Sequence, residues 1–186
     1  DGPSDAPLRQ AILDHRPMAD IRAADRSRTG APDADLLNLA VKYPKALRYL
    51  LDRGANPNTA NSFGKTPLMY AAQYNQIQSA KLLLRAGADI NAKTVVPPND
   101  CSVSLHTINV TALHYAVRYS SAPLIKLLLA NGAAAFKAQP NGYTNVQPLG
   151  TPLDWLYHYS QPGKRGNPRI SPHDVPELAK ALGSTR

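Results

Sequence analysis

The hydrophobic residues of this chain recur in one phrase. A threonine, then proline or alanine, then a run of mostly apolar residues returns at three places, each followed by a leucine-rich stretch and a glycine. The copies begin at Thr66, Thr111 and Thr151. A phrase that returns at intervals of roughly 20–50 residues indicates a repeat architecture. Its content predicts a helix-turn-helix unit in each copy.

Glycines and threonines mark where these helices end and begin. Gly54 and Gly87 lie 33 residues apart, each just past a leucine run, and Gly132 ends a third run in the same way. Glycine suits this position because it adopts the left-handed backbone that ends a helix without a Cβ penalty. A threonine before proline or alanine suits a helix cap followed by the first helical residue.

The repeated phrase resembles the ankyrin repeat. That family's pattern is Thr-Pro-Leu-His-x-Ala-Ala in the first helix, a leucine-rich second helix, and then Gly-Ala-Asp/Asn-x-Asn; residues 64–92 match it almost throughout. The resemblance implies an all-α solenoid of helix-turn-helix units with finger-like turns between repeats. It also implies that the histidine of the phrase, here His114, ties neighbouring turns together. Met69 and Asp154 replace it in the other copies.

The repeats predict one elongated domain with a cap at each end. Residues 35–183 are expected to form about four repeats including a C-terminal cap, and residues 1–34 a degenerate N-terminal capping half-repeat. A solenoid needs caps because its last apolar face would otherwise lie in water. Ser171 and Pro172 resemble a capping box with proline at the first helical position, and so predict a closing helix over residues 175–182.

Two connections are longer than the period allows. Thr66 and Thr111 lie 45 residues apart, and Thr111 and Thr151 lie 40 apart, against a period of about 33. The extra residues fall in turns between repeats, near 94–107 and 139–149. Insertions in repeat proteins tend to gather on the binding face. Long surface loops also tolerate drift because their closure costs little, so both interpretations stay open.

Positive charge dominates all but the start of the chain. The net charge is +8; residues 42–186 carry sixteen basic and six acidic side chains, whereas residues 1–41 carry five and seven. A basic surface raises the encounter rate with acidic partners. We expect an acidic protein partner rather than a nucleic acid, because the basic residues form no tight stripe that would track phosphates. No apolar stretch approaches the ~20 residues that cross a bilayer, so we expect no membrane insertion.

The candidate binding residues come from aligning the first helices of the repeats. Of the two positions that follow the small residues of the phrase, the second holds tyrosine in all four copies. The pairs are Lys42-Tyr43, Gln73-Tyr74, Arg118-Tyr119 and His158-Tyr159. The resemblance implies that these positions face the concave groove in which family members bind partners. Tyrosine and arginine dominate interface hot spots; the alternative is that the tyrosines only pack on one another and stiffen the stack.

Other residues complete the predicted binding site. Phe63 and Lys65 precede the best-matching repeat, and Val96 and His106 belong to the first insertion. We expect these four residues to widen a contact whose central anchors are the tyrosines of the second and third copies. The groove would be rigid before binding, so that little entropy is lost on association.

The predicted role is neutralisation of a secreted toxin or enzyme, as by a bacterial immunity protein or inhibitor. This hypothesis rests on the start at Asp1 without methionine, the single cysteine and the small size. It implies a periplasmic or exported protein, with a cytoplasmic location as the alternative. The competing binding role is an assembly scaffold without inhibitory action.

No catalytic site, metal site or cofactor is predicted. The five histidines have no metal-type spacing among themselves or with Cys101. Cys101 and His106 are the one thiol and imidazole close in sequence, with Asp100 as a candidate orienting acid, but a catalytic pair needs rigid support. An enzyme is therefore the least favoured class, and it predicts loss of activity on Cys101→Ala.

Overall fold

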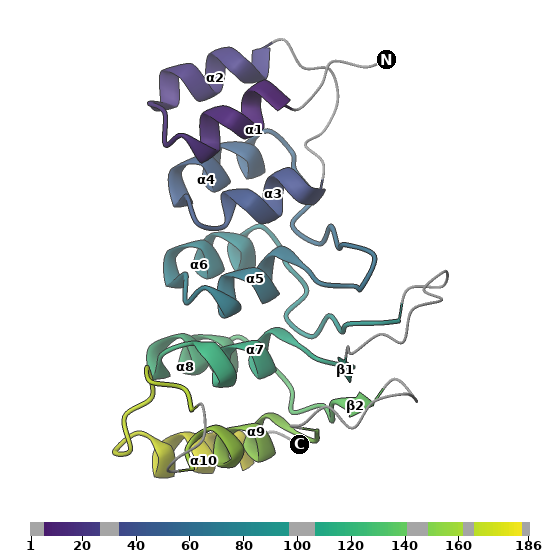
Figure 1. Cartoon of the computed structure of the whole chain (residues 1–186), viewed down its shortest axis with the longest axis vertical. Helices are drawn as coiled ribbons and strands as arrows, with labels where there is room; N and C mark the ends of the chain where they lie inside the picture. The colour runs from purple at the N-terminus through teal and green to yellow at the C-terminus, as the bar shows by residue number, and fades with distance from the viewer. Residues whose placement is uncertain (1–5, 27–33, 97–106, 141–148, 162–165, 184–186) are drawn as a thin grey trace.

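In the computed structural model the helices stack in pairs along one axis (Figure 1). The structure describes residues 6–26, 34–96, 107–140, 149–161 and 166–183. First helices contact first helices along the stack, and second helices form the other layer. The pairs are α1 (Ala6–Leu13) with α2 (Met18–Arg26), α3 (Ala34–Ala40) with α4 (Pro44–Asp52), α5 (Pro67–Gln73) with α6 (Ile77–Arg85), α7 (Ala112–Tyr119) with α8 (Ala122–Ala130), and α9 (Pro152–Tyr159) with α10 (Val175–Gly183). The predicted all-α ankyrin-type solenoid is confirmed.

The helix boundaries follow the residues that predicted them. Thr66, Thr111 and Thr151 stand immediately before α5, α7 and α9 with extended backbone. Proline opens α5 and α9, where the first amide has no partner within the helix and its loss costs nothing. The glycines after α4, α6 and α8 adopt positive φ angles of 87°, 86° and 89°, as the left-handed helix ending requires.

Polar side chains join each repeat to the next at both ends of the helices. At the helix turns, the Ser79 hydroxyl donates to the Val41 carbonyl at 2.6 Å, and the Ser120 hydroxyl donates to the Ala72 carbonyl. Both serines are fully buried. Because each bond satisfies a carbonyl at the end of a neighbouring first helix, it fixes the spacing of the stack.

Two asparagines tie the connecting turns on the other side. The Asn58 amide donates to the Gly87 carbonyl at 3.1 Å and accepts from the Asp89 amide at 2.6 Å. One period later Asn91 repeats the arrangement with Gly132 and Ala134, at 3.3 and 2.9 Å. The regular part of the finger-like turns is therefore held by asparagine at the same place in successive repeats.

The ends of the two predicted insertions pair with each other. β1 (Thr107–Ile108) and β2 (Gln139–Pro140) form a two-stranded antiparallel ladder. The Thr94 amide donates to the Val110 carbonyl at 3.0 Å, and Ala138 exchanges two backbone hydrogen bonds with Gly150 at 2.7 and 3.1 Å. Both insertions thus leave the stack at one side, to the right in Figure 1. Most of each insertion lies outside the described residues.

The two ends of the chain differ in detail from the prediction. Within the predicted cap the structure describes residues 6–26, which form α1 and α2, packed against each other and on the next pair; their role as a cap stays a prediction. At the other end Ser171 does not cap a helix. Its carbonyl accepts from the Asp174 amide at 2.9 Å and its hydroxyl from His173 at 3.3 Å, which forms a turn before α10.

None of the helices within the described residues has the length and apolar composition that a bilayer crossing requires. Buried leucines instead fill the space between the two helix layers, as Leu68, Leu83, Leu113 and Leu124 illustrate with 0 or 1% exposure. The apolar faces of the helices are therefore used within the stack.

Replacing Gly64 with alanine is expected to destabilise the protein more than the same change at Gly54. Both residues have positive φ, but a Cβ at Gly64 would lie 2.9 Å from the Lys93 carbonyl oxygen, whereas a Cβ at Gly54 meets nothing within 4 Å. Gly54→Ala should cost about 1–2 kcal/mol from backbone strain alone, and Gly64→Ala should cost more. Urea unfolding of both variants measures the difference; equal losses would contradict the close approach at Gly64.

Candidate functional site

Two helices each present a pair of stacked tyrosines on the first-helix layer. The ring centroids of Tyr70 on α5 and Tyr74, the residue that follows this helix, are 6.2 Å apart with an interplanar angle of 24°. Tyr115 and Tyr119 on α7 repeat the geometry at 6.4 Å and 20°. Side chains four residues apart lie on the same face of a helix, so each pair forms one aromatic surface. Tyr74 and Tyr119 were predicted, whereas their partners were missed.

Three cations lie over the tyrosine rings of this layer and link neighbouring repeats. The Lys42 ammonium lies 4.1 Å from the Tyr74 ring centroid. The Lys65 ammonium lies 4.2 Å from that of Tyr70 and 4.4 Å from that of Tyr115, so it bridges α5 and α7. The Arg118 guanidinium lies 4.8 Å from the centroid of Tyr119 and 5.3 Å from that of Tyr159 on α9. All are within the ~6 Å that cation–π attraction requires.

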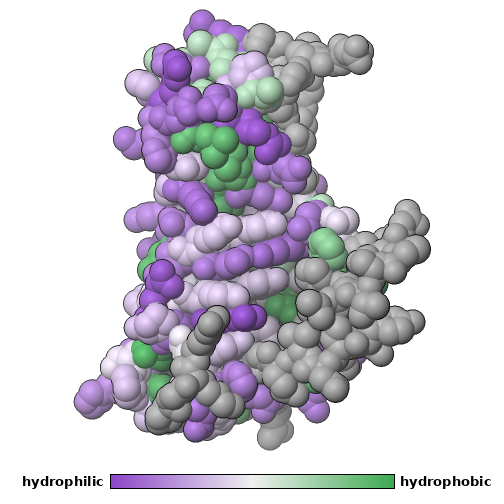
Figure 2. All heavy atoms as spheres, in the orientation of Figure 1, coloured by the Kyte–Doolittle hydropathy of each residue, from purple (hydrophilic) through white to green (hydrophobic). Residues whose placement is uncertain are grey.

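We call this set the tyrosine–cation row. Figure 2 shows pale and strongly hydrophilic side chains alternating in parallel bands over α5 and α7. The alternative that the tyrosines pack on one another and stiffen the stack agrees in part with this geometry, because the rings stack in pairs and the cations connect them across repeats. Tyr74 nevertheless keeps 37% of its surface exposed. The row consists of Lys42, Lys65, Tyr70, Tyr74, Tyr115, Arg118, Tyr119 and Tyr159.

No carboxylate of the described residues forms an ion pair with the cations of the row. Among the described residues, Lys42, Lys65 and Arg118 make no ion pair, although three lysines or arginines elsewhere do. Neither α5 nor α7 contains an acidic residue. The cations are therefore held by tyrosine faces, which stabilise a positive charge without neutralising it.

Lys65 is the most enclosed of the three cations. Its ammonium donates to the Gln73 side-chain oxygen and lies between two tyrosine rings. Burial lowers its pKa to about 8, because removing water disfavours the charged form. Burial likewise raises the pKa of Tyr115 to about 12, so this tyrosine keeps its proton at neutral pH. Lys65, which was predicted, thus lies inside the row, and the predicted Gln73 contacts the row through its hydrogen bond with Lys65.

Replacing Lys65 with methionine is expected to raise the free energy of unfolding at pH 7 by roughly 1–3 kcal/mol, because the aliphatic chain stays and a desolvated charge goes. The gain should shrink between pH 8 and 10.5. In that window the unfolded chain holds the Lys65 proton and the folded chain has released it, so the wild type gains stability as the pH rises. Urea unfolding of both proteins across the window is the measurement; a difference independent of pH would contradict the buried ammonium.

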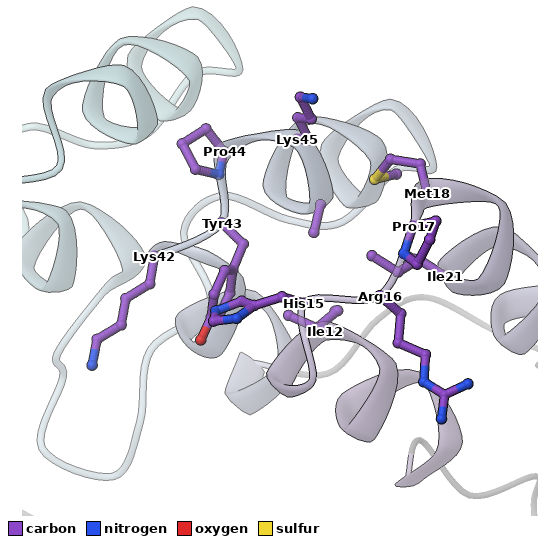
Figure 3. Close-up of a pocket in the computed structure, with 11 residues that line it drawn as sticks. Ile12, His15, Arg16, Pro17, Met18, Ile21, Lys42, Tyr43, Pro44 and Lys45 are labelled. Atoms are coloured by element: carbon purple, nitrogen blue, oxygen red, sulfur yellow. The ribbon is translucent and has the colours of Figure 1, made fainter.

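Tyr43, the first predicted tyrosine, lies apart from the row. Its ring meets His15 edge-on with centroids 4.7 Å apart, and both residues line an open pocket of about 530 Å³ between the α1–α2 and α3–α4 turns. Figure 3 shows the two rings next to each other, with the Lys42 side chain extending away from them. The pocket is mainly apolar, with Ile12, Pro17, Met18, Ile21, Pro44 and Ala46 in its lining. It extends the candidate surface toward the N-terminus.

The C-terminal end of the row is packed differently. Tyr159 contacts Trp155 at 6.2 Å and His158 at 5.0 Å between ring centroids, both edge-on. Trp155 is 4% exposed. Tyr159 is therefore held by α9 itself and closes the row.

The predicted residues near the insertions are placed only in part. Phe63 is half-buried, and its carbonyl accepts from the Val95 amide at 2.9 Å. Val96 has 43% of its surface exposed beside Val95 with 49%, so two apolar side chains face solvent where the first insertion leaves the stack. His106, Cys101 and Asp100 lie outside the described residues. Among the residues that the structure does describe, no cluster of His, Cys, Asp or Glu is arranged to hold a metal ion.

His114 has the structural role that its place in the phrase predicts. Its Nδ1 accepts from the Thr111 amide at 3.2 Å and lies 3.0 Å from the Thr111 hydroxyl. Since Nδ1 accepts, Nε2 carries the proton and donates to the Gly150 carbonyl at 3.1 Å. Full burial lowers the pKa to about 4. Asp154 takes over the capping role in α9, where it accepts from the Thr151 amide at 2.7 Å.

This architecture is typical of a helical repeat protein. It consists of stacked helix pairs, turns tied by asparagines and an exposed face on the first helices. Residues 12–94 match a family model described as Ankyrin repeats (3 copies), and residues 109–136 match one described as Ankyrin repeat. The chain belongs to the ankyrin-repeat family. Proteins of this family generally mediate protein–protein interactions and are typically binding modules rather than enzymes.

Three relatives illustrate the range of proteins that the chain is similar to. A putative ankyrin repeat protein of fowlpox virus is 33% identical over 113 residues, which are 59% of this chain and 30% of that protein. Ankyrin repeat and SOCS box protein 6 of Pongo abelii is 38% identical over 85 residues, 41% of this chain and 19% of its own length. Cyclin-dependent kinase 4 inhibitor B of Bos taurus is 36% identical over 92 residues, 47% of this chain and 70% of that protein. The chain thus spans less than a third of the first two relatives.

Proposed function

We propose that this chain binds an acidic protein through the tyrosine–cation row and through the adjoining parts of its finger turns that lie nearest the stack. The observation that carries the proposal is the row itself. It places three cations without ion pairs to described residues among five tyrosines on one face. Carboxylates of a partner would supply the missing counter-charges, and the rings would supply apolar contact area with few rotatable bonds.

The row is suited to binding because its side chains are ordered before a partner arrives. Stacking fixes the tyrosines in pairs, and the cations bridge neighbouring helices. Immobilising a flexible side chain on binding costs about 0.5–1.5 kcal/mol, so a row that is already ordered loses less. Tyr74 and Tyr119 are the proposed anchors, and an apolar side chain of the partner fits the pocket beside Tyr43.

A narrower version of the proposal is inhibition. The name of the bovine relative, of which the alignment covers 70%, describes an inhibitor of a kinase, so one protein with a similar stack acts by blocking another. Our specific version is an exported bacterial inhibitor or immunity protein that neutralises a toxin or secreted enzyme. An assembly scaffold would use the same face and leave the partner's activity unchanged. We propose no catalytic role for the chain.

An affinity pull-down from an extract of the source organism tests the proposal. The wild type is compared with Tyr74→Ala/Tyr119→Ala, with Tyr157→Ala as a matched control because Tyr157 is exposed and belongs to α9 but not to the row. We expect an acidic protein that is retained by the wild type and the control and lost with the double variant. Retention by all three would refute binding through the row. An assay of the captured protein's activity then separates inhibitor from scaffold.

A further inference from the structure

The second-helix layer carries a basic groove between α4 and α6, which adjoins the pocket beside Tyr43 because Pro44 and Lys45 line both. Two adjoining hollows of about 340 and 480 Å³ share Arg48, Leu82 and Arg85 in their linings. Lys45 and Lys81 line the first hollow, so each wall of the groove bears two cations. Lys45 stands at the start of α4, where Figure 3 shows it next to Pro44. We call this surface the outer groove.

The four cations of the outer groove are exposed and outnumber its acidic residues. Lys45, Arg48, Lys81 and Arg85 are all exposed, and within the described residues none of them makes an ion pair. Asp52 is the one acidic residue in the two linings. Like charges three or four residues apart on one helix repel each other, as do those facing across the groove. An acidic occupant would relieve that repulsion.

The floor of the groove indicates which kind of anion fits. Half-buried Leu51, Leu82 and Pro44 and buried Ala55 supply its apolar surface. Phosphate groups of a nucleic acid gain nothing from an apolar floor, whereas a polypeptide presents carboxylates and apolar side chains together. An amphipathic acidic segment matches both features of the groove, with its charges on the rims and its apolar stripe on the floor.

We propose that the outer groove is a second docking site, independent of the tyrosine–cation row, for an acidic amphipathic polypeptide segment. Lys45 and Arg48 on one wall and Lys81 and Arg85 on the other pair with its carboxylates. Leu51 and Leu82 receive its apolar side chains. The protein then holds two partners, or two parts of one partner, on its two helix layers.

Titration of the full chain with three fluorescent probes of equal charge tests the proposal. They are a peptide of glutamate, leucine and alanine with its leucines on one helical stripe, an oligoglutamate, and an oligothymidylate. The mixed peptide is expected to bind most tightly, and Arg48→Ala/Arg85→Ala to weaken it about tenfold. Lys137→Ala/Lys180→Ala removes the same charge from exposed positions elsewhere and should have no effect. Tyr74→Ala/Tyr119→Ala should likewise leave the affinity unchanged.

Several results would overturn the second site. Equal or tighter binding of either simple polyanion would mean that the apolar floor has no role. Unchanged affinity in the arginine double variant, or failure of the mixed peptide to bind the wild type, would show that the outer groove is not a docking site for such a peptide. Lys45→Gln/Lys81→Gln provides a second variant, and circular dichroism of both checks that the helices are intact. Loss of peptide binding in the tyrosine double variant would assign the peptide to the row instead.

Discussion

Replacing His114 with alanine is expected to lower the free energy of unfolding by about 3 kcal/mol at pH 7. The imidazole is completely buried and joins two repeats, because one nitrogen accepts from Thr111 and the other donates to Gly150. Its loss leaves the buried Thr111 amide without a partner and removes one of the two hydrogen bonds to the Gly150 carbonyl, which still accepts from the Ala138 amide. It also opens a gap beside Trp155, whose ring centroid lies 4.9 Å away. Thermal or urea unfolding measures the change.

The same histidine makes stability depend on acid. Its pKa lies near 4 in the folded chain, against 6.5 for an ordinary histidine. Between these values the unfolded chain binds the proton and the folded chain does not, so the stability present above pH 6.5 is lost as the pH falls. The slope reaches up to about 1.4 kcal/mol per pH unit, and the gap between wild type and His114→Ala should narrow toward pH 4.

His173 provides the control for this prediction. It is an exposed histidine in the turn before α10, and His173→Ala should change stability by less than about 0.5 kcal/mol. A similar small effect at His114, or a gap that does not narrow with acid, would contradict the neutral, hydrogen-bonded imidazole.

Reversing the charge of Arg118 is expected to give the largest single-residue loss of partner affinity. Arg118→Glu should cost at least about 2 kcal/mol, or roughly thirtyfold in Kd. The guanidinium lies over both Tyr119 and Tyr159, and a carboxylate there would repel the ring faces and an acidic partner alike. Because Arg118 is exposed, the fold should persist. Calorimetric titration with the captured partner measures the loss.

Salt dependence separates this specific contact from general charge. The affinity of the wild type should fall with ionic strength, and that of Arg118→Glu should fall less steeply because an attractive charge is gone. Lys180→Glu makes the same change of net charge on α10 and should leave the affinity nearly unchanged. If the two reversals weakened binding equally, net charge and not the row would account for the attraction.

The sequence predicts the helices well because their ends have residue-specific requirements. Proline at the start of α5 occupies a position where the missing amide costs no hydrogen bond, and Gly87 after α6 has a positive φ angle that few other residues adopt. The predicted helix cap at Ser171 was wrong because a serine hydroxyl accepts hydrogen bonds from the amides of a turn as readily as from those of a helix. The pairing of β1 with β2 depends on how close successive turns lie, which no local pattern records.

The binding face could be predicted only in outline. Aligned repeats identify Tyr74 and Tyr119, but Tyr70 and Tyr115 fall within the apolar phrase and resemble core residues. The missed signal is tyrosine four positions earlier in both copies, since that spacing stacks rings on one helix face. The bridging position of Lys65 depends on the distance between α5 and α7, so it emerges only when the repeats are stacked.

Photo-crosslinking from the row tests the central claim most directly. A benzophenone amino acid is placed instead of Tyr74 in one protein and instead of Tyr157 in another, and each is irradiated with the bound partner. Tyr157 is the more exposed, at 50% against 37%, so unspecific contact would favour it. We expect a covalent adduct from the Tyr74 position and none from that of Tyr157. An adduct from the Tyr157 position alone, with the complex intact, would show that the partner binds elsewhere.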